Sequence, residues 1–320
     1  MSIAARSRFA RFSWATLLGN VLVILWGAYV RATGSGAGCG GHWPLCNGVV
    51  LPRQPAVETI IEFTHRLSSG LALLLVIGLF WSARRTFKPG NQIRRSTAAA
   101  LLFMVVEALL GAGLVVFELV AGNVSIARAA AGAAHLLNTF LLLAALSLTA
   151  SWSTWPAERS HGNAPRALTS LLGIGLIGVL FIGMTGAIAA LGDTLFPSSS
   201  LLEGLRQDLD PGSNILLRLR GMHPLVAIGV SSYLIVLIRM QSSKNGSPEW
   251  LSRPLLVLII FQLAAGALNV LLLAPVWLQL IHLLLADGVW IGLVMYADRL
   301  LFSREESVRA AGGLQETSRV

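Results

Sequence analysis

The chain has 320 residues, of which 55% are hydrophobic and only 12% are charged, and its mean hydropathy is +0.71. This composition excludes an ordinary water-soluble enzyme, because the chain contains repeated apolar runs of about 20 residues, the length of a membrane-crossing helix. The net charge of +9 does not indicate binding to nucleic acid, because the basic residues are spread over the ends of these runs, where they face anionic lipid.

Eight apolar runs predict eight transmembrane helices. No stretch alternates like a strand of an outer-membrane barrel, so helices are the expected way to satisfy the backbone in lipid. The sequence therefore predicts an all-α integral membrane protein, with helices near 13–31, 60–83, 96–117, 128–150, 167–190, 215–238, 254–274 and 277–298.

The distribution of basic residues predicts the orientation in the membrane. An even number of spans puts both termini on one side, and with cytoplasmic termini 17 of the 24 basic residues lie in the cytoplasm, as the positive-inside rule requires. We expect a multi-pass protein of the bacterial inner membrane. The serine- and arginine-containing start could instead be an organellar presequence, but we favour a retained first helix. The seven basic residues on the other side are Arg31, Arg53, Arg66, Arg128, Arg206, Arg218 and Arg220.

The connection between the first two runs contains the only two cysteines, Cys39 and Cys46. The predicted topology puts both in an oxidising compartment, so we expect a disulfide. Because the bond would close a short loop, a redox role stays open beside a structural one. Alternatively, the two thiolates and His42 could bind a metal ion, although a fourth ligand is missing.

Four of the six histidines lie inside apolar runs, where an ionisable side chain is costly and therefore predicts a function. They lie on the second, fourth, sixth and eighth runs, each about 10 Å deep at the helical rise per residue. In an up-down-up-down bundle, residues of equal depth on alternate helices converge on the bundle axis. We interpret them as two pairs of haem ligands, His65 with His135 and His223 with His282. For any single histidine the alternative is an interhelical hydrogen bond. A metal other than haem iron also stays open, although two ligands per site are too few for a closed zinc site.

The histidine pairs also indicate a tandem repeat. The third and seventh runs share a polar residue followed by a glycine, Glu107-x-x-x-Gly111 and Gln262-x-x-x-Gly266. Because four spans return the chain to the same side, we expect a pseudo-twofold axis along the membrane normal. We predict an N-terminal four-helix bundle over 1–155, with an outer loop at 32–58, and a C-terminal bundle over 156–320.

Further ionisable residues lie near the predicted sites. Glu62 is three positions before His65 on the same helix face and could relay a proton or orient the imidazole, although a wet carboxylate at a helix start is the alternative. Arginines at the outer helix ends suit haem propionates, or they extend to the lipid surface: Arg66, Arg128, Arg218 and Arg220.

Two carboxylates and one connection complete the polar features. Glu107 and Asp287 fall near the middle of the membrane, and we expect each to be hydrogen-bonded to a neighbouring helix, with a proton path as the alternative. The polar connection 191–213 is expected to form an amphipathic segment over the mouth of the bundle.

These motifs resemble the haem A synthase family over nearly the whole chain. The resemblance rests on Cys39…Trp43-Pro44-x-Cys46-x-Gly48, Glu62-Phe-Thr-His65-Arg66, the three later histidines and Gln262…Gly266…Asn269-Val270…His282…Trp290. Two departures are the Gly41-His42 pair and Glu107, which stands where the resemblance leads us to expect a glutamine that matches Gln262.

The resemblance implies an oxidoreductase that converts the C8 methyl group of haem O to a formyl group in two steps, for the biogenesis of haem–copper oxidases. It implies that His65 and His135 bind the substrate haem, with Glu62 in a catalytic role, and that His223 and His282 hold a permanent haem b. An iron with two histidine ligands has no free position for oxygen, so either one ligand leaves during turnover or water supplies the oxygen.

The implied partners are haem O, the lipid bilayer, haem O synthase (protohaem farnesyltransferase) and an electron donor that the sequence does not identify. A homo-oligomer stays open. No nucleic acid is expected.

Three other functions compete with the synthase. A di-haem cytochrome of the b type that carries electrons from a quinol explains the four histidines, but gives no function to the cysteine loop or to Glu62. A transporter or haem exporter built from two repeats predicts a water-lined path, and the scarcity of charge at mid-membrane argues against it. An assembly chaperone that carries haem is the third alternative.

Overall fold

The computed structural model describes residues 3–155, 165–242 and 248–317, with side chains described to residue 301. Within these residues the fold is all-helical, apart from a single isolated bridge between Cys46 and Val49. Eight helices are long and apolar enough to cross a membrane, which confirms the predicted class of fold. They are α1 (Ile3–Ala32), α2 (Val57–Thr86), α3 (Gln92–Val116), α4 (Ile126–Thr154), α5 (Arg166–Leu195), α7 (Ile215–Ser242), α8 (Glu249–Leu271) and α9 (Val276–Thr317).

Side-chain caps begin several of these helices where a polar residue precedes the apolar run. The Asn91 side chain accepts a hydrogen bond from the backbone N–H of Ile93, and Ser125 accepts one from Arg128. Each cap satisfies an N–H group that has no partner within its helix. The first turns of α3 and α4 are therefore fixed by local sequence.

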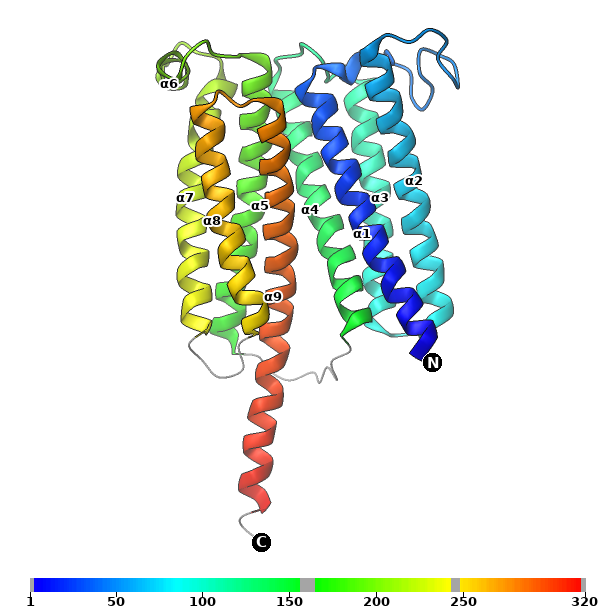
Figure 1. Ribbon diagram of the computed structural model, residues 1–320, viewed down its shortest axis with the longest axis vertical. Coiled ribbons are helices and arrows are strands. Elements are labelled where there is room, and N and C mark those ends of the chain that lie inside the picture. Colours follow the sequence, from blue (N-terminus) through cyan, green and yellow to red (C-terminus); the bar gives the residue numbers. More distant parts are fainter. Residues whose placement is uncertain (1–2, 156–164, 243–247, 318–320) are drawn as a thin grey trace.

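The helices pack in two groups (Figure 1), and the contacts within each group close it into a ring of helices. Helix α1 contacts α2 and α4, and α3 contacts the same two helices, whereas α5 contacts α7 and α9, and α8 contacts the same two. Each ring contains four consecutive membrane-crossing helices. The first and last halves of the chain therefore form most of their contacts internally.

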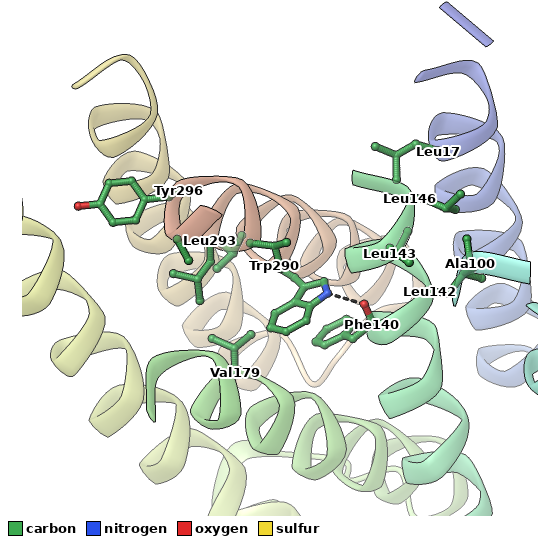
Figure 2. Packing of buried hydrophobic residues seen from close by; sticks show 14 of the residues in the cluster. Leu17, Ala100, Phe140, Leu142, Leu143, Leu146, Val179, Trp290, Leu293 and Tyr296 are labelled. Carbon is green, nitrogen blue, oxygen red and sulfur yellow. Dashed lines mark hydrogen bonds between the residues drawn. The ribbon is translucent and has the colours of Figure 1, made fainter. Parts of the chain in front are cut away.

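The two rings meet along α4, α5 and α9 (Figure 2). The Trp290 indole Nε1 donates to the Phe140 carbonyl oxygen at 2.6 Å. The indole and phenyl side chains also stack, with their centroids 5.4 Å apart. A Cβ atom at Gly183 would lie 2.8 Å from the Phe140 ring. The absence of a side chain at Gly183 thus allows α5 to approach this aromatic pair closely.

The two ends of the bundle differ (Figure 1). Both chain termini lie at one end, the terminal end, where α9 continues beyond the other helices as far as Thr317. The loop between α1 and α2 lies at the opposite end, the disulfide end. Of the basic residues predicted to be cytoplasmic, Arg159, Lys244 and Arg319 lie outside the described residues.

A short helix, α6 (Leu201–Leu209), also lies at the disulfide end. Its leucines Leu202, Leu205 and Leu209 are exposed and alternate with charged residues, which confirms the predicted amphipathic segment. Hydrogen bonds from the Ser199 hydroxyl and backbone N–H lower the pKa of the Glu203 carboxyl, because both stabilise its ionised form.

Candidate functional site

The four membrane histidines all lie within the first three turns of their helices, α2, α4, α7 and α9, at the disulfide end. His65 is close enough to His135 for the two rings to interact electrostatically, and His223 is likewise close to His282. The structure therefore brings together the same two pairs that the helix pattern predicts, one in each ring of helices.

Each histidine ring lies against a glycine of an adjacent helix. At three of these glycines a Cβ atom would lie closer to the imidazole Cε1 atom than an ordinary contact, so the missing side chain makes room for the ring, whereas at Gly111 the contact would be an ordinary one. The four pairs, with the Cβ–Cε1 distances, are Gly27 and His65 (2.9 Å), Gly111 and His135 (3.9 Å), Gly186 and His223 (3.1 Å), and Gly266 and His282 (3.1 Å). Gly27 was not identified from the sequence as a contact of His65. The spacing could have indicated it, because Gly27 precedes His65 by nearly the same number of residues as Gly186 precedes His223.

Three of the four Nδ1 atoms are buried and lack a hydrogen-bond partner among the described residues. The Nδ1 atoms of His65, His135 and His282 form no hydrogen bond with any described residue, and His223 Nδ1 lies 3.1 Å from the Thr185 hydroxyl. A buried polar atom without a partner is costly, and a metal bound by the ring would remove part of that cost. Paired neutral imidazoles are also a usual donor set for haem iron. The residues present therefore fit two haem groups with histidine ligands.

Glu107 is hydrogen-bonded to the neighbouring helix, as predicted. Its Oε2 accepts from the Asn138 amide nitrogen at 2.6 Å and its Oε1 accepts from the Thr139 hydroxyl at 2.5 Å. The same Oε1 lies 3.4 Å from His135 Nδ1. The carboxylate thus belongs to the surroundings of the first histidine pair.

The prediction that Asp287 is hydrogen-bonded to a neighbouring helix is wrong. Neither of its carboxyl oxygens has a hydrogen-bond partner among the described residues, although the side chain is only 1% exposed. Trp290 and Val294, on the same face of α9, belong to the hydrophobic core, so this face offers the carboxyl no donor.

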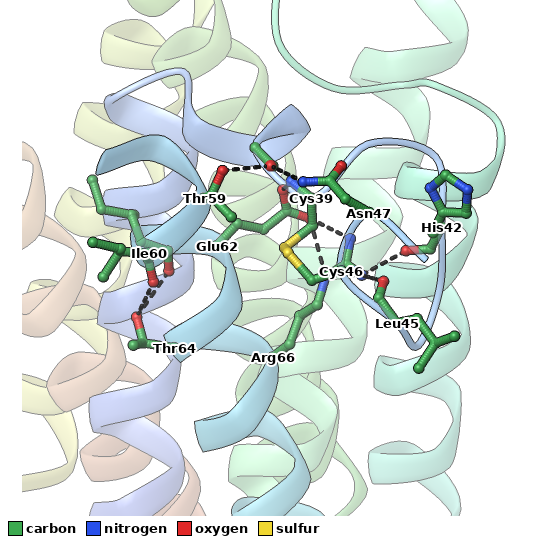
Figure 3. Close-up of a disulfide and its surroundings, with 12 residues drawn as sticks. Cys39, His42, Leu45, Cys46, Asn47, Thr59, Ile60, Glu62, Thr64 and Arg66 are labelled. Carbon is green, nitrogen blue, oxygen red and sulfur yellow. Dashed lines mark hydrogen bonds and ion pairs between the residues drawn. A yellow bond between two sulfur atoms is a disulfide. The ribbon is translucent and has the colours of Figure 1, made fainter. Parts of the chain in front are cut away.

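The disulfide between Cys39 and Cys46 is present, as predicted (Figure 3). Both sulfurs are therefore bonded to each other, which excludes the alternative metal site with His42. Gly38 brings this loop against the first turn of α2, since a Cβ atom there would lie 2.5 Å from the Glu58 backbone. The Thr59 hydroxyl donates to the Gly38 carbonyl oxygen at 2.7 Å.

Glu62 and Arg66 hold the same loop to α2 (Figure 3). The Glu62 Oε2 atom accepts from the Cys39 backbone N–H at 2.8 Å, while Oε1 pairs with the Arg66 guanidinium at 2.5 Å. The guanidinium also donates to the carbonyl oxygens of His42 and Leu45, each at 2.6 Å. Both side chains predicted to act near His65 therefore connect α2 to the disulfide loop.

The other predicted arginines differ in their partners. Arg128 donates to the carbonyl oxygens of Ala121 and Asn123 in the connection before α4. Arg220 pairs with Asp208 and Asp193. These two guanidinium groups thus hold the connections at the disulfide end.

Arg218, by contrast, is exposed and has no hydrogen-bond or ion-pair partner among the described side chains. It alone of the four candidates keeps all its donors free for another group.

Arg31 joins the two rings of helices, a contact that sequence reasoning missed. Its guanidinium donates to the Ala190 carbonyl oxygen at 2.6 Å, to the Thr194 hydroxyl at 2.8 Å and to the Gln279 side-chain oxygen at 2.8 Å. The acceptors belong to α5 and α9. No pattern in the sequence of α1 indicates them, because they lie more than 150 positions away.

Comparison with known proteins identifies the family of this chain. A family model described as "Cytochrome oxidase assembly protein", COX15-CtaA, matches residues 10–294. A protein of Thermus thermophilus named "Protoheme IX farnesyltransferase" is 50% identical over 304 residues, which are 94% of this chain and 50% of that protein.

Shorter matches are found with proteins named "Heme A synthase". The protein of Alkalihalophilus pseudofirmus is 44% identical over 34% of this chain and 37% of its own length, and that of Halalkalibacterium halodurans is 46% identical over 33% and 36%. The chain spans half or less of the length of these curated relatives. Because the family model matches most of the chain, the protein belongs to the COX15-CtaA family of cytochrome oxidase assembly proteins.

Proposed function

We propose that this protein is a haem A synthase, which oxidises the C8 methyl group of haem O to a formyl group in two successive two-electron steps. The observation that carries the proposal is the presence of two half-buried histidine pairs at one depth, each imidazole lying against a glycine of an adjacent helix. The choice of this reaction rests on the family and on the names of the relatives. The first step gives a hydroxymethyl group, and the second gives a gem-diol that loses water. Each step adds one oxygen atom, either from dioxygen, which is then also the oxidant, or from water, in which case an electron acceptor outside the chain takes up the two electrons.

The two halves of the chain have different tasks in this proposal. Residues 1–155 bind the substrate haem O through His65 and His135, and residues 156–320 bind a permanent haem b through His223 and His282. When bound, the haem irons supply the redox chemistry, and the protein sets their ligation, burial and charge. The disulfide loop and the acidic side chains near the first pair support its assignment as the reaction site.

Glu62 is the proposed proton-handling group of the reaction site. Its carboxylate is 3% exposed and lies one turn from His65 on α2. The bonds to Cys39 and Arg66 hold the carboxylate in one orientation. A carboxylate fixed in this way can exchange protons or stabilise positive charge without first rearranging.

Arg218 is the best supported of the four proposed propionate ligands, because its guanidinium is free. Arg66, Arg128 and Arg220 would have to give up protein acceptors or use their remaining N–H groups. A free guanidinium can bind a carboxylate through two parallel hydrogen bonds. All four lie at the disulfide end, at the same end of the bundle as the histidines.

The Thermus relatives support haem O synthase as a partner. This chain corresponds to half of the length of proteins named for farnesyl transfer to protohaem IX. The other half of those proteins is free to carry the transferase that the name describes. A supplier of haem O joined to its consumer would hand over an insoluble substrate without releasing it.

We further propose the bacterial inner membrane as the location, with both termini in the cytoplasm. Clustered basic residues at the terminal end support this orientation, including Arg84, Arg85, Arg94 and Arg95 at the adjoining ends of α2 and α3.

The test is the haem content of the full chain purified from cells that also make haem O. Mass analysis of the extracted haems should find haem A or its hydroxymethyl precursor together with haem b. Replacing His65 by alanine should abolish the oxidised products and leave haem b in place. Two haem b molecules per chain without oxidised product would instead support the di-haem cytochrome.

A further inference from the structure

Glu107 and Gln262 occupy corresponding positions in the two halves. Each lies four residues before a glycine, Gly111 or Gly266, that contacts the histidine of the next helix. Each also approaches that histidine: Glu107 Oε1 lies 3.4 Å from His135 Nδ1, and Gln262 Nε2 lies 3.3 Å from His282 Nε2. The two side chains thus face different nitrogens of their histidine rings, Nδ1 at the first site and Nε2 at the second.

The Glu107 carboxylate is held in place by two donors from α4. The Asn138 amide nitrogen lies 2.6 Å from Oε2 and 2.9 Å from the Phe103 carbonyl oxygen, so both of its hydrogens have acceptors. The Thr139 hydroxyl lies 2.5 Å from Oε1 and 2.9 Å from the His135 carbonyl oxygen. The carboxylate is therefore positioned by the helix that carries the histidine.

A carboxylate can only accept a hydrogen bond, so the Nδ1 atom that it faces serves as the N–H side of the His135 ring. That atom is buried and has no other polar partner among the described residues. The remaining ring nitrogen then keeps its lone pair for a metal. At the second site the Gln262 amide nitrogen lies against Nε2 instead, and no described polar side chain bonds to the Nδ1 atom of His282.

We propose that Glu107 is a positioning residue for His135, which fixes the imidazole and makes it a more electron-rich iron ligand than His282. The inference rests on the proposed function, because it needs a haem at the first site. A carboxylate behind a ligating histidine raises the basicity of the ring. The ferric state of the haem in the N-terminal half is thereby favoured over the ferrous state, relative to the haem in the C-terminal half.

The test is spectroelectrochemical titration of the full-length, haem-loaded protein. The signal that disappears in the His65→Ala variant identifies the N-terminal haem. Glu107→Gln replaces the carboxylate by an uncharged amide of nearly the same shape, and should lower the preference for ferric over ferrous iron about tenfold. For a one-electron couple this is an upward shift of the midpoint potential by about 59 mV, with the other haem unchanged.

The second variant is Glu107→Asp, which keeps the carboxylate but draws it away from His135 Nδ1, and should give a smaller upward shift of the N-terminal haem with the C-terminal one unchanged. It also covers the case in which Glu107→Gln fails to assemble. If the wild-type N-terminal half binds no haem, both the proposed function and this inference fail. If it binds haem and neither substitution moves the potential of that haem, only the role of Glu107 is overturned.

Discussion

The contact between a glycine and an imidazole is the smallest unit of the candidate site. At Gly27 a Cβ atom would lie 2.9 Å from His65, whereas at Gly111 it would lie 3.9 Å from His135, an ordinary van der Waals distance. The two positions are otherwise similar, because both are helical glycines that face a proposed haem ligand. They therefore offer a matched pair of substitutions.

Gly27→Ala should displace the His65 ring and weaken haem binding in the N-terminal half. An overpacked contact of this kind costs about 1–3 kcal/mol, which corresponds to an affinity roughly 5- to 150-fold lower. Gly111→Ala should have little effect. Haem titration of the purified variants measures both affinities, and equal losses in the two would contradict a steric cause.

His135 shows how far sequence reasoning reaches at this scale. Helical spacing and depth predict its partner, His65, because both lie on helices that run in the same direction. The same reasoning predicts that Glu107 bonds to a neighbouring helix, but it does not identify Asn138 and Thr139 as donors. It fails for Asp287, because the polarity of a buried face depends on which helices pack there.

The disulfide loop is the element whose placement depends most on single residues. Gly38 lies against the backbone of Glu58 and Thr59, so a side chain at this position cannot be accommodated by rotation of a neighbouring side chain. Gly41, three residues further on, has no atom within 4 Å of a Cβ and does not have a positive φ angle. The first glycine is required by packing, and the second is not.

Gly38→Ala should detach the loop from α2, while Gly41→Ala should not. The expected cost of about 1–3 kcal/mol makes the open loop roughly 5- to 150-fold more populated. The rate at which a water-soluble reductant cleaves the disulfide between Cys39 and Cys46 measures this population. The same rate in both variants would argue against the close packing of this loop.

The halves of the whole molecule are joined by a few specific contacts along α4, α5 and α9. The Trp290 indole bonds to Phe140 near the middle, and the Trp152 indole bonds to Asp298 at the terminal end, at 3.0 Å. Arg31 makes the corresponding connection at the disulfide end. The relative position of the two histidine pairs depends on these contacts.

Arg31→Met should lower the melting temperature of the full chain, because the half-buried acceptors on Ala190, Thr194 and Gln279 lose the donor that joins α1 to α5 and α9. Each unsatisfied buried group costs about 1–3 kcal/mol. Arg218→Met, at an exposed arginine, should change the stability by less than about 0.5 kcal/mol. Thermal unfolding in detergent compares the two, and equal melting temperatures would show that Arg31 does not join the halves.

The eight membrane-crossing helices and the disulfide were predictable at the scale of the molecule, because hydrophobic length and compartment determine them. The contacts between the halves were not. Arg31 and Gln279 are separated by 248 positions, and no local pattern encodes such a pairing. The same limit applies to Arg220, whose partners Asp193 and Asp208 depend on how the connection with α6 folds back.

All four histidines lie within three turns of the same end of their helices, so the two proposed irons share one level in the bilayer. An electron that passes between them travels parallel to the membrane plane. Moving a charge across the full membrane involves about 2.3 kcal/mol per 100 mV, but this lateral transfer crosses almost none of that voltage. The exchange between the two haem groups should therefore proceed equally well in energised and in de-energised membranes.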